Sequence, residues 1–329
     1  MIVSPGTDFG RRSVLAAGAA LAAAWAVPAR GAPLRELRVD WATYNPVSLV
    51  LRQQGLLETE FARDGIAVRW VQSAGSNKAL EFLNAGSLDF GSAAGAAALI
   101  GRAGSNPIRS VYVFSHPEWT ALVTLGDSPI RTVADLRGQR VAVTRGTDPH
   151  TFLIRALAEA GLSERDVKLV LLQHADGRTA LERGDVAAWA GLDPIMASAE
   201  VEGGARLFYR RAEANTWGVL NVREAFAAEH PEVVGRVLAR YEQARAWAVA
   251  NPRELRAMLA AATKLPDAVI ARQMERTDLS SGRIGPAQAG TVIEAGRALQ
   301  KAGVLGPELD IAALTRELID PSFADKLAS

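Results

Sequence analysis

Beyond residue 33, apolar positions alternate between short runs and stretches with helical spacing. Short apolar runs at 37–41, 68–71 and 88–90 are typical of strands, and residues 78–85 have helical spacing that Gly86 ends. A second block begins near residue 121, with strands predicted at 122–125, 141–143, 167–172, 186–189 and 206–209. Strands that alternate with helices predict an α/β architecture with two mostly parallel sheets flanked by helices.

The chain from Pro231 onward is predicted to be almost wholly helical, with Val234, Leu238 and Tyr241 on one face. Two α/β blocks followed by a helical return predict a bilobed binding protein with its ligand cleft between the lobes. We expect lobe 1 to comprise residues 34–118 and 218–329, and lobe 2 residues 119–217. The two crossings near 116–120 and 215–219 are the expected hinges.

The first residues have the pattern of an export signal. Arg11 and Arg12 precede a moderately apolar run at 14–27, and small residues follow at Ala29 and Ala32. The run is shorter than the roughly 20 residues that a membrane-spanning helix needs. We therefore predict a twin-arginine signal over residues 1–29 and a periplasmic mature protein, with cleavage after Ala32 as the alternative site. An N-terminal membrane anchor is the competing interpretation.

Composition narrows the function classes. The chain has 49% hydrophobic and 22% charged residues, a formal net charge of +1 and no cysteine. The near-neutral charge argues against nucleic-acid binding, and the missing cysteine excludes disulfides, thiolate metal sites and a cysteine nucleophile. The four histidines have no metal-ligand spacing. We expect no metal, no cofactor and a monomer.

Several segments carry a resemblance to a known family. They are residues 83–91, residues 127–143, the loop 145–150, and Asp193-Pro194 after Trp189. Together they resemble the periplasmic binding proteins that serve importers of aliphatic sulfonates, taurine and nitrate. The resemblance implies the type II periplasmic-binding-protein fold and delivery of a small organic anion to an ABC permease in the inner membrane.

Helix starts in these segments are suited to anion binding, because unpaired backbone N–H groups and the helix dipole point at one place. Residues 91–95 are small, and Ser92 and Ala93 there are expected to contact ligand. Thr147 and His150 are expected to donate to an oxyanion at the next helix start. Asp148, just before Pro149, either caps that helix or contacts a cationic group of the ligand.

The remaining candidates have both a ligand-binding and a structural interpretation. Asp193-Pro194 is a third predicted N-cap with proline at the first helical position. Trp189 at a strand end is either a cleft wall or core. Tyr44 and Asn45 lie where a helix is expected to begin. Trp119 and Asn215 lie at the two crossings. The predicted ligand-binding set is Tyr44, Asn45, Ser92, Ala93, Trp119, Thr147, His150, Trp189, Asp193 and Asn215.

The predicted function is capture of an aliphatic sulfonate between the lobes and its delivery to the permease, without catalysis. The alternatives are nitrate, taurine, an aryl sulfonate or a pyrimidine as ligand. A desulfinase-like enzyme on the same fold is a further alternative. Members of the family with that activity attack with a cysteine, which this chain lacks.

Overall fold

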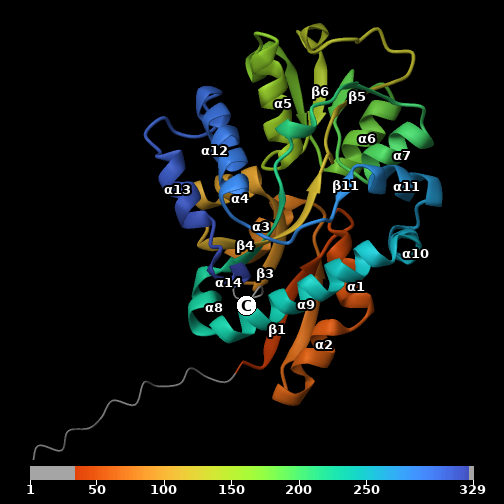
Figure 1. Ribbon diagram of the computed structural model, residues 1–329. Helices are drawn as coiled ribbons and strands as arrows, with labels where there is room; N and C mark the ends of the chain where they lie inside the picture. Colours follow the sequence, from red (N-terminus) through yellow and green to blue (C-terminus); the bar gives the residue numbers. More distant parts are fainter. Residues whose placement is uncertain (1–33, 326–329) are drawn as a thin grey trace, which may run out of the picture. The chain divides into compact units, whose positions relative to one another are not determined.

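The structure is a computed structural model that describes residues 34–325 (Figure 1). The predicted export signal and its cleavage site lie outside the described residues. Within 34–325, no helix is both long enough and apolar enough to cross a bilayer.

The first sheet has six strands in the order β11-β4-β10-β3-β1-β2. β1 pairs in parallel with β2 and β3, whereas β10 runs antiparallel to both of its neighbours, β3 and β4. The short β11 is antiparallel to β4 at the sheet edge. The strands are β1 (Glu36–Trp41), β2 (Ala67–Gln72), β3 (Phe90–Ala94), β4 (Ile108–Pro117), β10 (Gly218–Arg223) and β11 (Thr277–Asp278).

The second sheet has five strands in the order β7-β6-β8-β5-β9. β6 is parallel to β7 and β8, and β5 is antiparallel to β8 and β9. Both sheets are therefore mixed, and the prediction of mostly parallel sheets was wrong in this respect. The strands are β5 (Leu122–Thr124), β6 (Arg140–Val143), β7 (Lys168–Leu171), β8 (Ala188–Ala190) and β9 (Arg206–Tyr209).

Helices connect and cover the strands of both sheets (Figure 1). Those of the first strand block are α1 (Pro46–Gln53), α2 (Leu56–Phe61), α3 (Ser76–Asn84) and α4 (Gly95–Ala103). Those between the strands of the second sheet are α5 (Asp148–Glu159), α6 (His174–Glu182) and α7 (Ile195–Val201). Short 3₁₀ turns are η1 (Ala62–Asp64), η2 (Val133–Leu136), η3 (Glu164–Asp166) and η4 (Ala212–Ala214). The return is built from α8 (Glu224–Glu229), α9 (Pro231–Ala250), α10 (Pro252–Thr263), α11 (Asp267–Glu275), α12 (Pro286–Lys301), α13 (Ile311–Leu318) and α14 (Ser322–Asp325).

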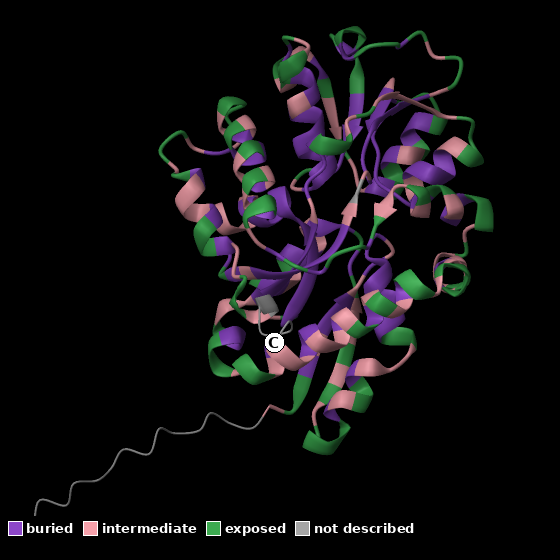
Figure 2. Cartoon of the chain, viewed as in Figure 1, coloured by how far each residue is buried: buried purple, intermediate pink, exposed green. Residues whose placement is uncertain are grey.

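The core lies along the strands, as Figure 2 shows by the buried positions of the sheets and the inward faces of the helices. β3, β5 and β8 are buried at every position. One apolar cluster surrounds the first sheet, and two clusters cover the second. Strands that are buried on both faces place their ends, and the loops that follow them, where side chains from several elements meet.

Local sequence signals account for several element boundaries. Gly55 has φ +61°, a conformation that favours glycine, and it lies between the end of α1 and the start of α2. Thr132 and Asp135 form a capping box that starts η2. Asn45 caps α1 by accepting the Ser48 N–H at 3.1 Å.

Candidate ligand-binding site

The ends of β1 and β3 carry a buried hydrogen-bond network. The carboxylate of Asp40 accepts both the backbone N–H and the hydroxyl of Ser92, each at 2.9 Å. Asn45 Nδ2 donates to the Ser92 hydroxyl at 2.8 Å, and the Tyr44 hydroxyl donates to the Ser92 carbonyl at 3.0 Å. Three predicted site residues, Tyr44, Asn45 and Ser92, are thus brought together.

The position of Ser92 differs from the prediction. Ser92 and Ala93 lie within β3, and α4 begins only at Gly95. The strand continues through residues 91–94 because their small side chains fit against α3 and β10, with Gly91 next to Leu83. The single hydroxyl proton of Ser92 is donated to Asp40, so Ser92 does not present a free donor here.

Asp148 forms a second buried network, between the two sheets. It accepts the indole N–H of Trp119 at 2.7 Å, and the backbone N–H and hydroxyl of Thr216 at 3.0 and 2.6 Å. The N-cap of α5 is Thr147, whose side chain makes no cap bond. The prediction that Asp148 caps its own helix was therefore wrong, because its oxygens bond to the two crossing segments instead.

Thr147 and His150 lie at the start of α5, as predicted, but their side chains have protein partners. The Thr147 hydroxyl donates to the Thr144 carbonyl at 2.6 Å. His150 Nε2 lies 2.9 Å from Glu164 Oε1, while its Nδ1 is buried without a partner among residues 34–325. An anion contact by these two side chains remains a prediction.

Trp189 lies in the core, whereas Asp193 adjoins the Asp148 network, because its backbone N–H donates to the Trp119 carbonyl at 2.9 Å. Trp189 is fully buried in the core of the second sheet, with its Nε1 next to Gly177. Asp193 accepts the Ala197 N–H at 2.9 Å and pairs with Arg276 at 2.9 Å. The predicted boundary was wrong by one residue, because α7 begins at Ile195 and Pro194 is its N-cap.

The crossing segments are held by polar and aromatic contacts. Asn215 accepts the Thr120 N–H at 2.9 Å, which ties one crossing to the other. His116 and Trp217 stack with ring centroids 3.8 Å apart. Trp119 packs edge-on against Tyr44 at 6.2 Å, so the Asp40 and Asp148 networks adjoin. Asn215 and Trp119 therefore have structural partners at the crossings.

Sequence reasoning missed a group formed by the starts of α3, α5 and α6. A Cβ built on Gly75 is 3.1 Å from His174 Nε2 and 3.0 Å from Asn77 Oδ1. One built on Gly146 is 3.9 Å from Asn77 Cβ, and Thr144 Oγ1 is 3.2 Å from His174 Nδ1. Three helix starts, one from the first sheet and two from the second, therefore meet.

None of these three helices has a side-chain cap in the structure described. Their first N–H groups have no partner within the helix, and the helix dipoles place partial positive charge there. Three buried polar atoms nearby also lack hydrogen-bond partners among residues 34–325: Ser73 Oγ, Asn77 Oδ1 and His174 Nε2. The arrangement is chemically suited to an oxyanion.

One signal in the sequence points to this group. Thr144 and His174 each follow a strand, and β6 and β7 are parallel neighbours. The carboxyl ends of neighbouring parallel strands meet at one sheet edge, so residues that follow these two strands lie close together. The position of Gly75 and Asn77 opposite them depends on how the two sheets pack, which spacing does not encode.

Comparison with known proteins places the chain in a family. The family model described as NMT1/THI5 like matches residues 61–255. The chain belongs to the NMT1/THI5-like family. It is 31% identical over 263 residues to the putative aliphatic sulfonates-binding protein of Escherichia coli K12, a match that covers 79% of this chain and 81% of the relative.

Solved structures of similar proteins show the same fold. The alkanesulfonate-binding protein of Xanthomonas axonopodis pv. citri, bound to MOPS, matches with TM-score 0.78 and 27% identity, over 86% of this chain and 98% of that one. The periplasmic aliphatic sulphonate binding protein of Escherichia coli matches with TM-score 0.74 and 26% identity, over 88% and 93%. This NMT1/THI5-like chain has the periplasmic-binding-protein fold, and these relatives are binding proteins.

Burial shifts the pKa of several groups in this NMT1/THI5-like chain. Desolvation raises the pKa of Asp40 and of Asp148 to about 6, although their hydrogen bonds act in the opposite direction. Desolvation also raises the pKa of Asp193 to about 7, against the effect of Arg276. Burial alone lowers the pKa of His174 to about 4.

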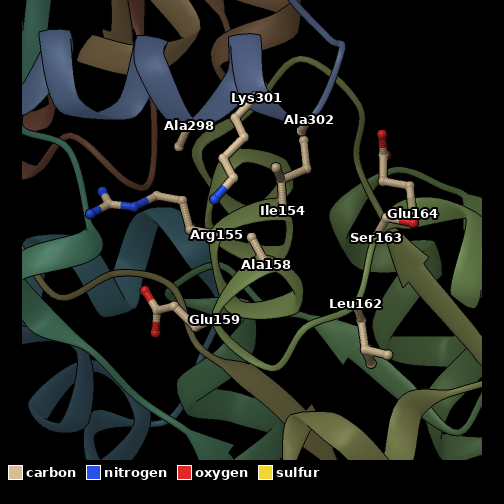
Figure 3. A pocket seen from close by; sticks show the side chains of 10 residues that line it. All are labelled: Ile154, Arg155, Ala158, Glu159, Leu162, Ser163, Glu164, Ala298, Lys301 and Ala302. Carbon is tan, nitrogen blue, oxygen red and sulfur yellow. The ribbon is translucent and has the colours of Figure 1, made fainter.

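Two pockets lie beside α5. One, of about 500 Å³, is lined by apolar side chains of α5 and α12 together with Arg155, Glu159 and Lys301. Figure 3 shows Lys301 extending from α12 toward α5. The other, of about 420 Å³, lies next to Arg145, Gly146 and His150. Among residues 34–325, no group of histidine and carboxylate side chains has the geometry of a metal site.

Proposed function

We propose that this chain is the substrate-binding component of an ABC importer, which captures aliphatic sulfonates in the periplasm and delivers them to an inner-membrane permease. The observation that carries the proposal is the meeting of the α3, α5 and α6 starts. Backbone N–H groups at helix starts that follow strands of both sheets can donate to the three oxygens of a sulfonate. The negative charge of a sulfonate is spread over these oxygens. The relatives named as sulfonate-binding proteins support this choice of ligand.

Transport function follows from contacts with both sheets. A ligand held by α3 on one side and by α5 and α6 on the other favours the conformation in which these elements are close. The permease would then recognise that conformation, and the chain would act as a monomer. No bond in the ligand changes, so no cofactor is needed.

Export is the second part of the proposal. Arg11 and Arg12 precede the apolar run of the predicted signal, and a cysteine for lipid attachment is missing. We expect the precursor to be exported by the twin-arginine route and cleaved after Ala29. Arg11→Lys with Arg12→Lys should retain precursor in the cytoplasm, measured by fractionation. Unchanged periplasmic recovery would contradict the export route alone.

Ligand identity is tested by competition binding along a series from methanesulfonate to octanesulfonate. Each buried methylene contributes about 0.8 kcal/mol, so affinity should rise about fourfold per carbon until the site is full. Nitrate, sulfate, taurine, an aryl sulfonate and a pyrimidine serve as comparison ligands. Tightest binding to nitrate or sulfate, without dependence on chain length, would contradict the sulfonate assignment.

A desulfinase-like enzyme on this fold is the competing proposal. Family members with that activity use a cysteine nucleophile, and the chain has none. Incubation with an aryl sulfinate and assay for released sulfite separates the two proposals. We expect no sulfite above the level seen without protein.

A further inference from the structure

His174 is the first residue of α6 and is almost fully buried, with 2% of its surface exposed. Its Nδ1 lies 3.2 Å from Thr144 Oγ1. Thr144 donates its only hydroxyl proton to the Leu172 carbonyl at 2.7 Å. Nδ1 must therefore carry the proton in this contact and donate to Thr144, which leaves Nε2 as a lone-pair acceptor.

Nε2 has no hydrogen-bond partner in the described part of the chain. It faces Gly75, where a built Cβ would be 3.1 Å away, at the start of α3. The backbone N–H groups of Ser76 and Asn77 make no hydrogen bond within α3, because the first N–H that donates to a helical carbonyl is that of Lys78. Gly75 has no side chain that could cap them. A buried imidazole without a partner thus points at an uncapped helix start from the other sheet.

We propose that His174 is a ligand-binding residue of this site, where an anionic oxygen lies against Nε2 and the start of α3 while the imidazole takes one proton from solvent. In the bound state, Nδ1–H donates to Thr144 and Nε2–H donates to the anion. The proton returns to solvent when the ligand leaves. This inference rests on the proposed function, because it assigns a residue and a linked proton to the same anion site.

The surroundings of His174 contain few charges that oppose this assignment. Burial alone accounts for its lowered pKa, about 4. The charged groups on the elements packed against it are mostly paired with other residues or exposed. They are Lys78 and Glu81 on α3, Asp148, Arg155 and Glu159 on α5, Asp176, Arg178 and Glu182 on α6, Glu200 on α7 and Glu202 just after it, Arg140 on β6, and Arg145 before α5.

A bound anion supplies the charge that this environment lacks. Contact with an opposite charge favours the imidazolium form, so the pKa of His174 rises in the complex. Between the pKa values of the free and bound states, binding takes up one proton. The affinity then increases as pH falls, by up to about tenfold per pH unit.

Calorimetry of the mature wild-type protein tests the linked proton. Butanesulfonate and sulfate are titrated at pH 6 in bis-tris and in succinate, which contain no sulfonate and differ in heat of ionisation. We expect uptake of about one proton and a dissociation constant that falls up to tenfold from pH 7 to pH 6. Binding with equal heats in the two buffers and no pH dependence would overturn the proposal.

Variants identify the group that takes up the proton. His174→Gln should bind without proton uptake and with an affinity independent of pH, whereas His230→Gln, at a helix junction against Phe226, should behave as wild type. Proton uptake that persists in His174→Gln would overturn the assignment. If that variant does not fold, NMR titration of the wild-type imidazole signals decides: a signal with a pKa near 4 must move to a higher pKa when butanesulfonate or sulfate is added.

The two proposals fail in different ways. If sulfate binds with proton uptake but affinity does not depend on alkyl length, the sulfonate function fails and the role of His174 stands. If sulfonate affinity increases with alkyl chain length but binding takes up no proton, the function stands and the role of His174 fails. If neither sulfonates nor sulfate bind, both are overturned.

Discussion

The indole N–H of Trp119 donates to the carboxylate of Asp148 across 2.7 Å. Trp119 lies in the segment that leaves the first sheet, and Asp148 is the first residue of α5. Thr216, in the returning segment, adds two further donors to the same carboxylate and accepts the Ala96 N–H of α4 at 3.1 Å. One buried carboxylate therefore holds both crossing segments against α5.

Replacing Asp148 is expected to destabilise the protein strongly. Asp148→Ala leaves the Trp119 and Thr216 donors buried without an acceptor, at a cost of about 3 kcal/mol or more in the free energy of unfolding. Urea denaturation measures the loss. Asp127→Ala, on an exposed loop, is the matched control and should change stability by less than about 0.5 kcal/mol. A loss no larger than that of the control would contradict the role of Asp148.

Stability is expected to rise as pH falls from 7.5 toward 5. The pKa values of Asp40 and Asp148 are about 6, and that of Asp193 is about 7, all above the unfolded value of 3.8. At a pH between 3.8 and these folded pKa values, the folded state therefore binds more protons than the unfolded state. The free energy of unfolding increases as pH falls through the folded pKa values. His174 acts in the opposite direction below pH 6.5, because its folded pKa is about 4.

Urea midpoints measured across this pH range check that sign. Asp148→Asn should remove the contribution of Asp148 to the pH dependence of the free energy of unfolding. A pKa shift of about two units makes this contribution about 3 kcal/mol at most. Stability that falls steadily from pH 7.5 to pH 5 would show that these carboxyls are ionised and stabilised in the fold.

Ser92→Ala separates a structural role from direct ligand contact. The change removes the hydroxyl that donates to Asp40 and accepts from Asn45, both buried. We expect a loss of about 1 to 3 kcal/mol in the free energy of unfolding. Butanesulfonate affinity, measured below the unfolding transition, should change less than tenfold. A much larger loss of affinity with unchanged stability would instead support the predicted ligand contact of Ser92.

Gly75→Ala tests how closely α3 approaches α6. Its φ of 165° is extended backbone that alanine adopts, so the effect arises from contact alone. The added Cβ would lie about 3 Å from His174 and Asn77, and relieving that contact should cost about 1 kcal/mol or more. Gly290→Ala in α12, with nothing within 4 Å, should be neutral or stabilising. Equal melting temperatures for both variants would contradict the close approach.

Much of the fold was predictable because its periodicity is local. The strand at 206–209 occurs at the predicted residues. β3 was placed two residues early, since its small residues resemble a turn, and β4 and β10 were not predicted. β10 contains Gly218 and the buried Asn221, whose side-chain oxygen accepts the Ser110 hydroxyl at 2.7 Å, and such residues do not indicate a central strand.

The site was predictable only in part. Tyr44, Asn45 and Ser92 lie together, because β1 and β3 are neighbouring parallel strands, Tyr44 and Asn45 follow β1, and Ser92 lies within β3. Their contact with ligand stays a prediction. The partners of their hydroxyl and amide groups were not predictable, since Asp40 lies within a strand and looks like an ordinary polar position. His174 was set aside because it lacks metal-ligand spacing, whereas its significance depends on Gly75 from the other sheet.

The place of β10 between β3 and β4 sets an order of assembly during synthesis. The middle of the first sheet is vacant until the ribosome has made residue 223, although β1 to β3 emerge first. The five strands of the second sheet come from one continuous stretch, Leu122 to Tyr209, and pair without waiting for distant residues. We expect the sheet that begins later in the chain to be completed earlier as the nascent chain folds.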